Sequence, residues 1–348
     1  MARPSSRSAS VTFGCVLAAS MALTGRAHGQ GGAIFAQPTR PFGIVTDSSG
    51  NVVVNADHTF SQGLEVYRSN GALLTYLQLG GFSDISGFSR LARLKNGRLL
   101  ALRQDGVIQL IDPPTGKVSV LLDVKTIPTD YLNIYDLAQG RTHNFSGTIL
   151  PQYSSFGDLA ILERSGQTDL ILTGLSQAQA FPFVIRVRIT STSVKSKVIA
   201  ASSASTAGTY NASRGIAVNS TGLVLTTLPY QTNVGSFDRL VTFSADFPET
   251  RSGLPAIQLK GTDFSSAGMT TDSTGVFYVA TSKLGTSLAG SRGSGALVKI
   301  SSDGKTVQRI FTLGGTVFDS RDVAISPAND RAYMTVNNYN AVVTFSLK

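Results

Sequence analysis

The stretch Ser213–Leu228, SRGIAVNSTGLVLTTL, decides the fold of this chain. It combines a short apolar strand, a polar turn that ends at Gly222, and a second apolar strand. The pattern recurs, in two cases in degenerate form, in five further segments: Phe42–Val54, Ser89–Leu102, Asp158–Thr173, Ala267–Thr281 and Ser320–Val336. Six copies of one strand–turn–strand unit predict a radial array.

The turns of these copies are regularly spaced, recurring every 47 to 69 residues at Gly50, Gly97, Gly166, Gly222, Gly275 and the pair Asn329–Asp330. Glycine suits such turns because it adopts positive φ without a steric penalty. Each copy except the last is followed by two more apolar or alternating runs, which gives four antiparallel strands per unit. Four-stranded units arranged radially are the blades of a β-propeller. The expected fold class is therefore all-β, a six-bladed β-propeller.

The sixth copy provides only three strands, which end at Ala341–Ser346. The segment Ala33–Gln37, ahead of the first copy, is a spare strand. An open ring would leave two strand edges with unpaired backbone groups. We therefore expect the N-terminal strand to complete the last blade and close the ring.

The first residues have the order of a secretory signal peptide. Arg3 and Arg7 precede the apolar run Val11–Thr24, and the small-residue site Ala27–Gly29 follows. We expect residues 1–29 to be a signal peptide and residues 30–348 to be a single propeller domain with a long insertion at 123–157. The mature chain would be secreted or periplasmic, with no membrane span, and would lack Cys15, the only cysteine.

Composition and charge argue against a disordered chain and against a nucleic-acid partner. A hydrophobic content of 42% with 15% charged residues argues against disorder. Loss of Arg3, Arg7 and Arg26 with the leader removes three positive charges and lowers the net charge from +9 to +6. The remaining cations are scattered, whereas a nucleic-acid site needs them clustered on one face. We expect a monomer that binds no nucleic acid and is mildly attracted to anionic partners.

The phrases GIVTDSSGNVVV, GIAVNSTGLVL and MTTDSTGVFYVA resemble NHL-type repeats and the wider group of gluconolactonase-like and strictosidine-synthase-like six-bladed propellers. The resemblance covers about residues 40–346 and implies the same fold. Gluconolactonase-like members hold calcium in the channel with a Glu, Asn and Asp set. Here Pro41–Phe42 stand in place of the Glu, and arginines at the inner positions would repel Ca²⁺. We therefore expect no metal or other cofactor, and calcium is disfavoured.

Residues just before each first strand should ring the central channel, because that strand is the innermost of its blade. They are Phe42, Ser89–Arg90, Asp158, Arg214, Ala267 and Arg321–Asp322. Guanidinium groups at Arg90, Arg214 and Arg321 would either grip an anionic ligand or make structural ion pairs with Asp158 and Asp322. Asn338 and Tyr339 are further ligand-binding candidates, because they lie in a loop on the same face of the ring as the residues just before the first strands.

The turns between first and second strands should lie on one face of the ring, and the longer loops on the other, the long-loop face. We expect a small-molecule or protein ligand, anionic in character, at the long-loop face and channel mouth. The alternative is a hydrolase or lactonase, or a metal-free strictosidine-synthase-like enzyme, that uses Asp158, His143 and His58 as acid–base groups. The connection Asp123–Gly157 would be either a lid or an inert insertion.

Overall fold

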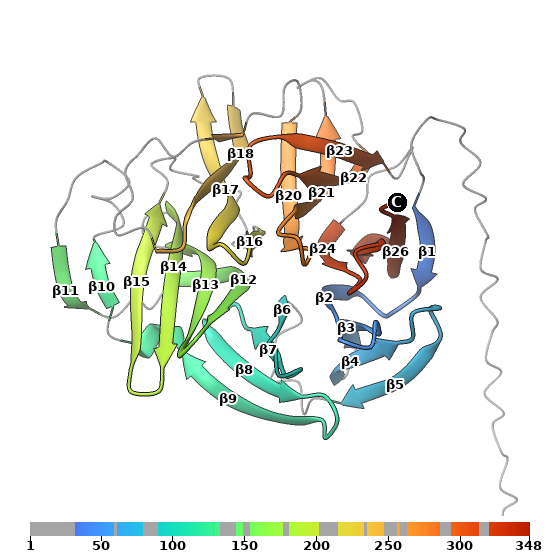
Figure 1. Ribbon diagram of the computed structural model, residues 1–348, viewed down its shortest axis with the longest axis horizontal. Helices are drawn as coiled ribbons and strands as arrows, with labels where there is room; N and C mark the ends of the chain where they lie inside the picture. The colour runs from blue at the N-terminus through green and yellow to red at the C-terminus, as the bar shows by residue number, and fades with distance from the viewer. Residues whose placement is uncertain are drawn as a thin grey trace, which may run out of the picture.

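The protein is a ring of six β-sheets around a central channel (Figure 1). The computed structural model describes residues 32–58, 61–78, 90–127, 129–132, 144–148, 154–176, 181–201, 215–232, 235–246, 256–257, 263–285, 294–312 and 320–348. Within these ranges no helix is long and apolar enough to cross a membrane. The expected all-β, six-bladed propeller is confirmed.

The first three blades follow one another around the ring. Blade 1 contains β2 (Pro41–Thr46), β3 (Val52–His58), β4 (Ser61–Tyr67) and β5 (Leu73–Gln78). Blade 2 contains β6 (Arg90–Arg93), β7 (Leu99–Leu102), β8 (Val107–Asp112) and β9 (Lys117–Asp123). Blade 3 contains β12 (Ser154–Arg164), β13 (Gln167–Ser176), β14 (Phe181–Thr190) and β15 (Val194–Ala201).

The last three blades complete the circle. Blade 4 contains β16 (Ile216–Val218), β17 (Leu223–Thr232), β18 (Gly235–Ser244) and β19 (Ala256–Ile257). Blade 5 contains β20 (Asp263–Thr271), β21 (Phe277–Gly285), β22 (Ser294–Ile300) and β23 (Val307–Thr312). Blade 6 contains β24 (Ser320–Ile325), β25 (Arg331–Val336), β26 (Ala341–Ser346) and β1 (Ala33–Ala36), and the short helix η2 (Asn337–Tyr339) joins β25 to β26.

The first strand of each blade is innermost, as the repeat pattern predicts. The strands β2, β6, β12, β16, β20 and β24 each contact the next one around the ring, and β24 contacts β2 again. The inner edge of each strand has no paired strand in its sheet. The backbone groups on that edge must therefore find partners at the ring axis.

The hydrophobic core is divided into six clusters, one between each pair of neighbouring blades. Strand alternation sends successive side chains to opposite faces of a blade. Ile44 accordingly packs toward blade 6 and its neighbour Val45 toward blade 2. Each fully buried aliphatic side chain contributes roughly 1.5–3 kcal/mol, so the interfaces between blades supply most of the stability.

Three of the turns that identified the repeat, in blades 1, 4 and 5, share one hydrogen-bond pattern. The Asp47 carboxylate accepts hydrogen bonds from the amides of Ser49 and Asn51, both at 2.8 Å. Asn219 and Asp272 accept equivalent bonds in blades 4 and 5. The turn then needs a residue with positive φ, which Gly222 provides at 85°.

The ring closes through the N-terminal strand, as expected from the strand count. β1 pairs antiparallel with β26 and is the outermost strand of blade 6 (Figure 1). The Phe35 ring lies edge-on to Tyr333 at 4.8 Å between centroids and to Tyr67 of blade 1 at 6.4 Å. The closure strand therefore binds both its own blade and the next one.

The long connection between blades 2 and 3 contributes strands to the outer edge of blade 3. After η1 (Val124–Thr126), β10 (Thr129–Leu132) pairs in parallel with β15, and β11 (Asn144–Thr148) pairs with β10. This hairpin lies at the periphery of the ring (Figure 1). The rest of the connection lies outside the described residues, so its role as a lid stays a prediction.

Substitution of Phe35 by alanine should loosen the ring closure. We expect a loss of about 2 kcal/mol in the free energy of unfolding, less than for a fully buried phenylalanine, measured by urea denaturation. Ile34→Ala, at an exposed neighbouring position in β1, is the control and should cost much less. Equal, small effects of both substitutions would contradict the role of β1 in closing the ring.

Candidate functional site: a charged hub below the central cavity

One position recurs at the channel in all six blades, immediately before the apolar core of the first strand. We call it the axial position; it is occupied by Gly43, Arg90, Asp158, Gly215, Gly268 and Asp322. Three of the six side chains are thus charged and three are absent. Charged residues and glycines follow no regular order around the ring. The repeat itself therefore does not require a charged residue at the axial position.

Strand irregularities accompany the axial position in four blades. The pairing of first and second strands shifts register between Pro41 and Ile44, between Phe156 and Leu159, between Ser266 and Met269, and between Ser320 and Val323. A bulge breaks the alternation of side chains and re-aims one of them. The axial residue therefore escapes the blade interface and can reach the channel.

Asp158 bonds the open edges of neighbouring blades. One carboxylate oxygen accepts from the amide of Leu159 at 2.8 Å, and the other accepts from Ile216 in blade 4 at 2.9 Å. Its own amide donates to the Thr173 hydroxyl at 2.9 Å. Ile216 directly follows the axial glycine Gly215.

Asp322 makes the same set of contacts on the other side of the ring. Its oxygens accept from Val323 at 2.8 Å and from Ile44 of blade 1 at 3.1 Å. Its amide donates to the Thr335 hydroxyl, which in turn donates to the Phe42 carbonyl at 2.9 Å. Two aspartates thus satisfy inner-edge amides that have no strand partner.

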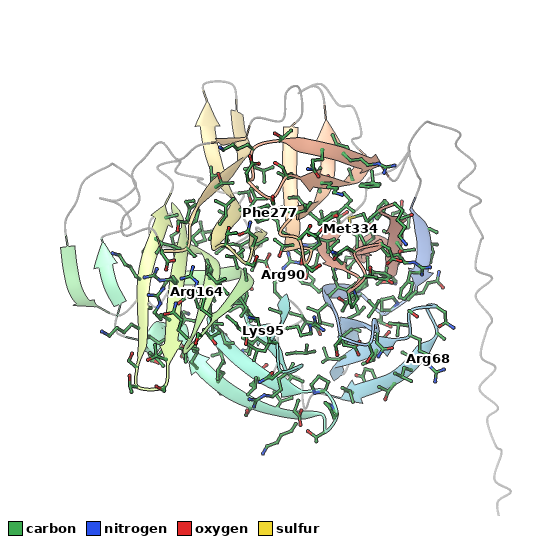
Figure 2. All side chains as sticks on the ribbon, in the orientation of Figure 1. Arg68, Arg90, Lys95, Arg164, Phe277 and Met334 are labelled. Carbon is green, nitrogen blue, oxygen red and sulfur yellow. The ribbon has the colours of Figure 1, made fainter. Side chains whose placement is uncertain are left out.

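Arg90 provides the positive charge between these carboxylates, at the centre of the ring in Figure 2. Its side chain is completely buried; one guanidinium nitrogen donates to the Arg321 carbonyl and lies 3.9 Å from Asp322. Its guanidinium also lies over the Phe42 ring at 5.0 Å. Nε and Nη2 have no hydrogen-bond partner within the described ranges. We call Arg90, Asp158 and Asp322 the hub.

Burial disfavours the charged forms of both aspartates. It raises the pKa of Asp158 to about 6 against the opposing effects of Arg90 and the bonded amides. Burial also raises the pKa of Asp322 to about 7; Arg90 opposes the shift and Asp158 adds to it. The folded chain thus keeps protons that unfolded aspartates release above about pH 4. These two groups make the free energy of unfolding fall as the pH rises from about 4 to 7.

A cavity of about 570 Å³ extends from the hub along the channel. Asp158 and Asp322 lie at its inner end, and the turns around Asn219 and Ser273 surround its outer end. It therefore opens on the turn face, opposite the long-loop face. Arg93 lies three residues beyond Arg90 along β6, which is about 10 Å of strand.

Arg93 differs from the other charged residues of this wall. It is exposed, and it has no hydrogen bond or ion pair among the described residues. Lys95 instead bonds Glu163 through its amide at 2.7 Å and bonds the Glu163 carbonyl through Nζ at 3.2 Å. The Asp272 carboxylate is used within its own turn. Arg93 is therefore the charge available to a ligand.

The structure brings together only part of the residue set expected from sequence. Arg90, Asp158 and Asp322 meet in the hub, and the Arg321 guanidinium lies over the Phe42 ring at 5.2 Å. Asn338 and Tyr339 lie in η2, between the second and third strands of blade 6. The remaining three candidates cannot be placed: His143 and Arg214 lie outside the described residues, as does the side chain of His58. The ligand-binding or catalytic role of all these residues stays a prediction.

Sequence reasoning missed Arg93 and the axial glycines. The phrases FGIV, RGIAV and AGMTT place Gly43, Gly215 and Gly268 at equivalent points of the repeat, so the sequence alone could have identified these glycines. Blade 4 thus carries glycine at the axis, one residue after Arg214. No pattern in the sequence distinguished Arg93, because its difference from other cations is the lack of a partner.

The hub fits a calcium ion poorly. Calcium takes six to eight oxygen ligands, whereas both oxygens of each hub carboxylate already accept amide hydrogens and a guanidinium lies beside them. Within the described ranges no three His, Cys, Asp or Glu residues gather into a metal-binding group. That the protein works without a cofactor stays a prediction.

Comparison with known proteins supports the fold alone. No family model and no curated protein matches the chain. A solved structure of a candidate gluconolactonase is 13% identical with a TM-score of 0.53, covering 92% of this chain and 93% of its own. A Bacteroides thetaiotaomicron protein of unknown function is 11% identical with a TM-score of 0.53, covering 91% and 72%. The Cps50 (Swd1) propeller domain of Myceliophteria thermophila is 10% identical with a TM-score of 0.52, covering 92% and 100%.

These neighbours confirm the propeller and its likeness to gluconolactonase-like propellers. Because identity is low, they carry no statement about ligand or reaction. The assignment of the repeats to the NHL type stays a prediction.

Replacement of Gly268 by alanine should damage the hub. A Cβ atom there would lie 2.0 Å from a carboxylate oxygen of Asp322 and 2.6 Å from its Cα. We expect a loss of about 3 kcal/mol in the free energy of unfolding, measured by urea denaturation. Gly97→Ala, which meets no atom but has a φ of 86°, should lose only about 1 kcal/mol. Similar losses for the two variants would contradict the close packing of Asp322 on blade 5.

Proposed function

We propose that the protein is an exported, secreted or periplasmic, binding protein that holds a small anionic molecule in its central channel. The single observation that carries this proposal is the cavity with the unpartnered Arg93 at its wall and the buried hub at its inner end. From the sequence, we expect the ligand at the long-loop face. The described cavity opens at the opposite mouth of the same channel, and we propose that the ligand binds there.

The size and composition of the cavity support a small molecule rather than a protein partner. Its volume of about 570 Å³ is typical of small-molecule sites. Its wall consists of six inner strands, which a ring closed on all sides holds rigidly. A rigid, concave wall with a few polar groups costs little to order on binding.

The charge at the wall supports an anionic ligand. Arg93 can offer a bidentate pair of N–H donors to a carboxylate, whereas the neighbouring Lys95 and Asp272 are already engaged. The two acidic groups and one guanidinium of the hub disfavour a second anionic group at the inner end, where uncharged hydroxyl groups fit better. A polyol that carries one carboxylate combines both features.

Export, the monomeric state and the lack of nucleic-acid binding rest on the sequence. Arg3, Arg7 and Val11–Thr24 form the leader pattern, and the mature chain has no run of Lys or Arg. These statements are part of the proposal. The mass of the exported chain would test the first of them, because removal of the leader lowers it.

A hydrolase is the second candidate, and one observation favours it. Asp158 and Asp322 line the cavity with pKa values raised by burial to about 6 and about 7, and such shifts are frequent among acid–base groups. Their oxygens, however, are occupied by amides of the strand edges. Structural satisfaction of those amides explains the two aspartates without a reaction, so we favour binding.

The proposal predicts that D-gluconate binds, and that D-glucitol, the same polyol without the carboxylate, does not. Arg93→Gln should weaken gluconate binding by about tenfold, the effect of losing a charged hydrogen-bond partner, as measured by calorimetry. Arg98→Gln is the matched control, because Arg98 lies in the turn of the same blade away from the cavity lining, and it should bind normally.

If gluconate, citrate and succinate all failed to bind, the proposal of an anionic ligand would be contradicted. Gluconate binding by Arg93→Gln as tight as that of the parent would contradict it as well. Hydrolysis of glucono-1,5-lactone that disappears in folded Asp158→Asn or His143→Ala would instead favour the enzyme.

A further inference from the structure

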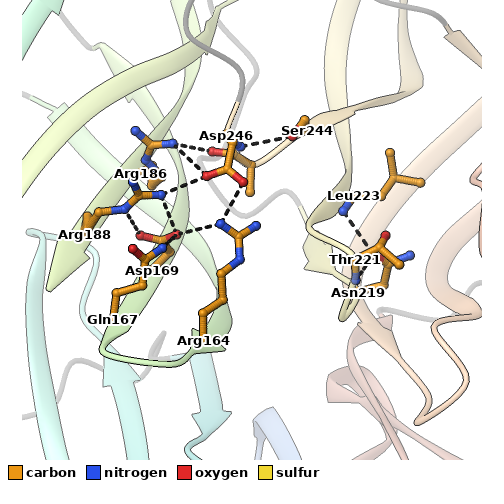
Figure 3. Close-up of polar contacts among 11 residues, drawn as sticks. Arg164, Gln167, Asp169, Arg186, Arg188, Asn219, Thr221, Leu223, Ser244 and Asp246 are labelled. Atoms are coloured by element: carbon orange, nitrogen blue, oxygen red, sulfur yellow. Dashed lines mark hydrogen bonds and ion pairs between the residues drawn. The ribbon is translucent and has the colours of Figure 1, made fainter. Parts of the chain in front are cut away.

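A second charged cluster lies between blades 3 and 4, and Figure 3 shows its arginines and aspartates. Its member Arg164 lies outside the ring centre in Figure 2. We call the whole group the rim cluster; its members are Arg164, Asp169, Arg186, Arg188, Lys195, Lys197 and Asp246. Arg164 ends β12, the other blade 3 members lie on β13, β14 and β15, and Asp246 follows β18 of blade 4. The cluster thus has five cations and two carboxylates, and the three arginines make all of its ion pairs among the described residues.

Both carboxylates are fully engaged by arginines. Arg188 makes a bidentate pair with the buried Asp169 at 2.7 and 2.9 Å and also reaches Asp246 at 2.9 Å. Arg164 lies 2.7 Å from Asp246. Arg186 lies 3.7 Å from Asp246 and donates to the Ala245 carbonyl at 2.6 Å. Burial and then the charge of Arg188 hold the pKa of Arg186 below its usual range.

The two lysines add positive charge to a region that is already cationic. In the register of β14 and β15, Lys197 stands directly opposite Arg186, and Lys195 stands opposite Arg188. Directly opposed residues share one face of the sheet, and like charges in this arrangement are destabilising. No ion pair or aromatic contact of either lysine occurs within the described residues. The ion pairs of the cluster account for its arginines and aspartates, but folding stability does not account for the two lysines.

Blade 5 contains a comparable like-charged pair, which shows how the repeat normally accommodates one. Lys299 stands opposite Arg309, but Lys299 lies over the Tyr278 ring at 5.8 Å and Arg309 over the Phe311 ring at 4.6 Å. Aromatic faces offset the repulsion there. Blade 3 has no such compensation for Lys195 and Lys197 among the residues described, which points to a bound anion.

We propose that the rim cluster binds a chain of an anionic polysaccharide. Its four cations on β14 and β15 form a grid of about 5 Å by 7 Å, which matches repeated negative charges better than one point anion. Among the described residues, the cluster includes no aromatic side chain on which nucleic-acid bases could stack. An acidic peptide cannot add as a strand at Ser196 and Lys197, because β10 already pairs there. This proposal is independent of the ligand in the channel.

The test titrates the full mature chain with heparin, a sulfated polysaccharide, at several salt concentrations. Binding should weaken as salt screens the charges. The double variant Lys195→Gln/Lys197→Gln should bind roughly fivefold more weakly, the loss expected from charge contacts at the exposed Lys195 and the half-buried Lys197. Lys117→Gln/Lys305→Gln changes the net charge equally on blades 2 and 5 and should bind as tightly as the parent.

Several outcomes would overturn the proposal. An equal loss in the control variant would show that only net charge matters. Polyglutamate or single-stranded DNA that binds as tightly as heparin would remove the preference for polysaccharide, and inorganic sulfate that competes equally at matched sulfate concentration would identify a free anion. A fall in the melting temperature of the Lys195/Lys197 variant would assign the lysines a structural role, whereas relief of repulsion should leave it unchanged or raise it.

Discussion

The inner edges of six first strands meet at the ring axis, and their backbone groups have no further strand to pair with. Buried amides without partners are costly. Asp158 and Asp322 meet this need by accepting from Ile216 and Ile44 of the next blade, and Arg90 offsets the charge of the two carboxylates. The blades are thus joined at the axis by side-chain hydrogen bonds and between their faces by apolar packing, while β1 joins the two ends of the chain.

The same arrangement separates the parts of the molecule that serve folding from those free to bind. Gly268 leaves the space that the Asp322 side chain occupies, and the hub lies at the ring axis. Above the hub the channel stays open as the cavity, where Arg93 has no hydrogen bond or ion pair among the described residues. At the rim, Lys195 and Lys197 likewise exceed what the fold requires. Charges without a structural partner are thus the features on which both proposed binding sites rest.

Much of the fold could be predicted from the sequence, because turn chemistry and strand alternation are local. Gly222 and its equivalents marked the repeats, and the missing strand after Ala341–Ser346 predicted closure by the N-terminus. The candidate site was only partly predictable. Position along the repeat identified Arg90, Asp158 and Asp322, but their contacts depend on bulges and on neighbouring blades, which no local pattern encodes. The cavity and the isolation of Arg93 are properties of the assembled ring.

The central claim is that the hub carboxylates are buried and hold the inner strand edges together. Titration of the Asp158 and Asp322 side-chain carboxyl carbons by NMR, assigned through Asp→Asn variants, tests it most directly. Midpoints for both groups well above those of solvent-exposed aspartates in the same spectrum are the predicted result, because burial raises the pKa of each carboxyl group. Midpoints near 4 for both, the value of a solvated aspartate, would mean that water reaches the hub and would contradict the account.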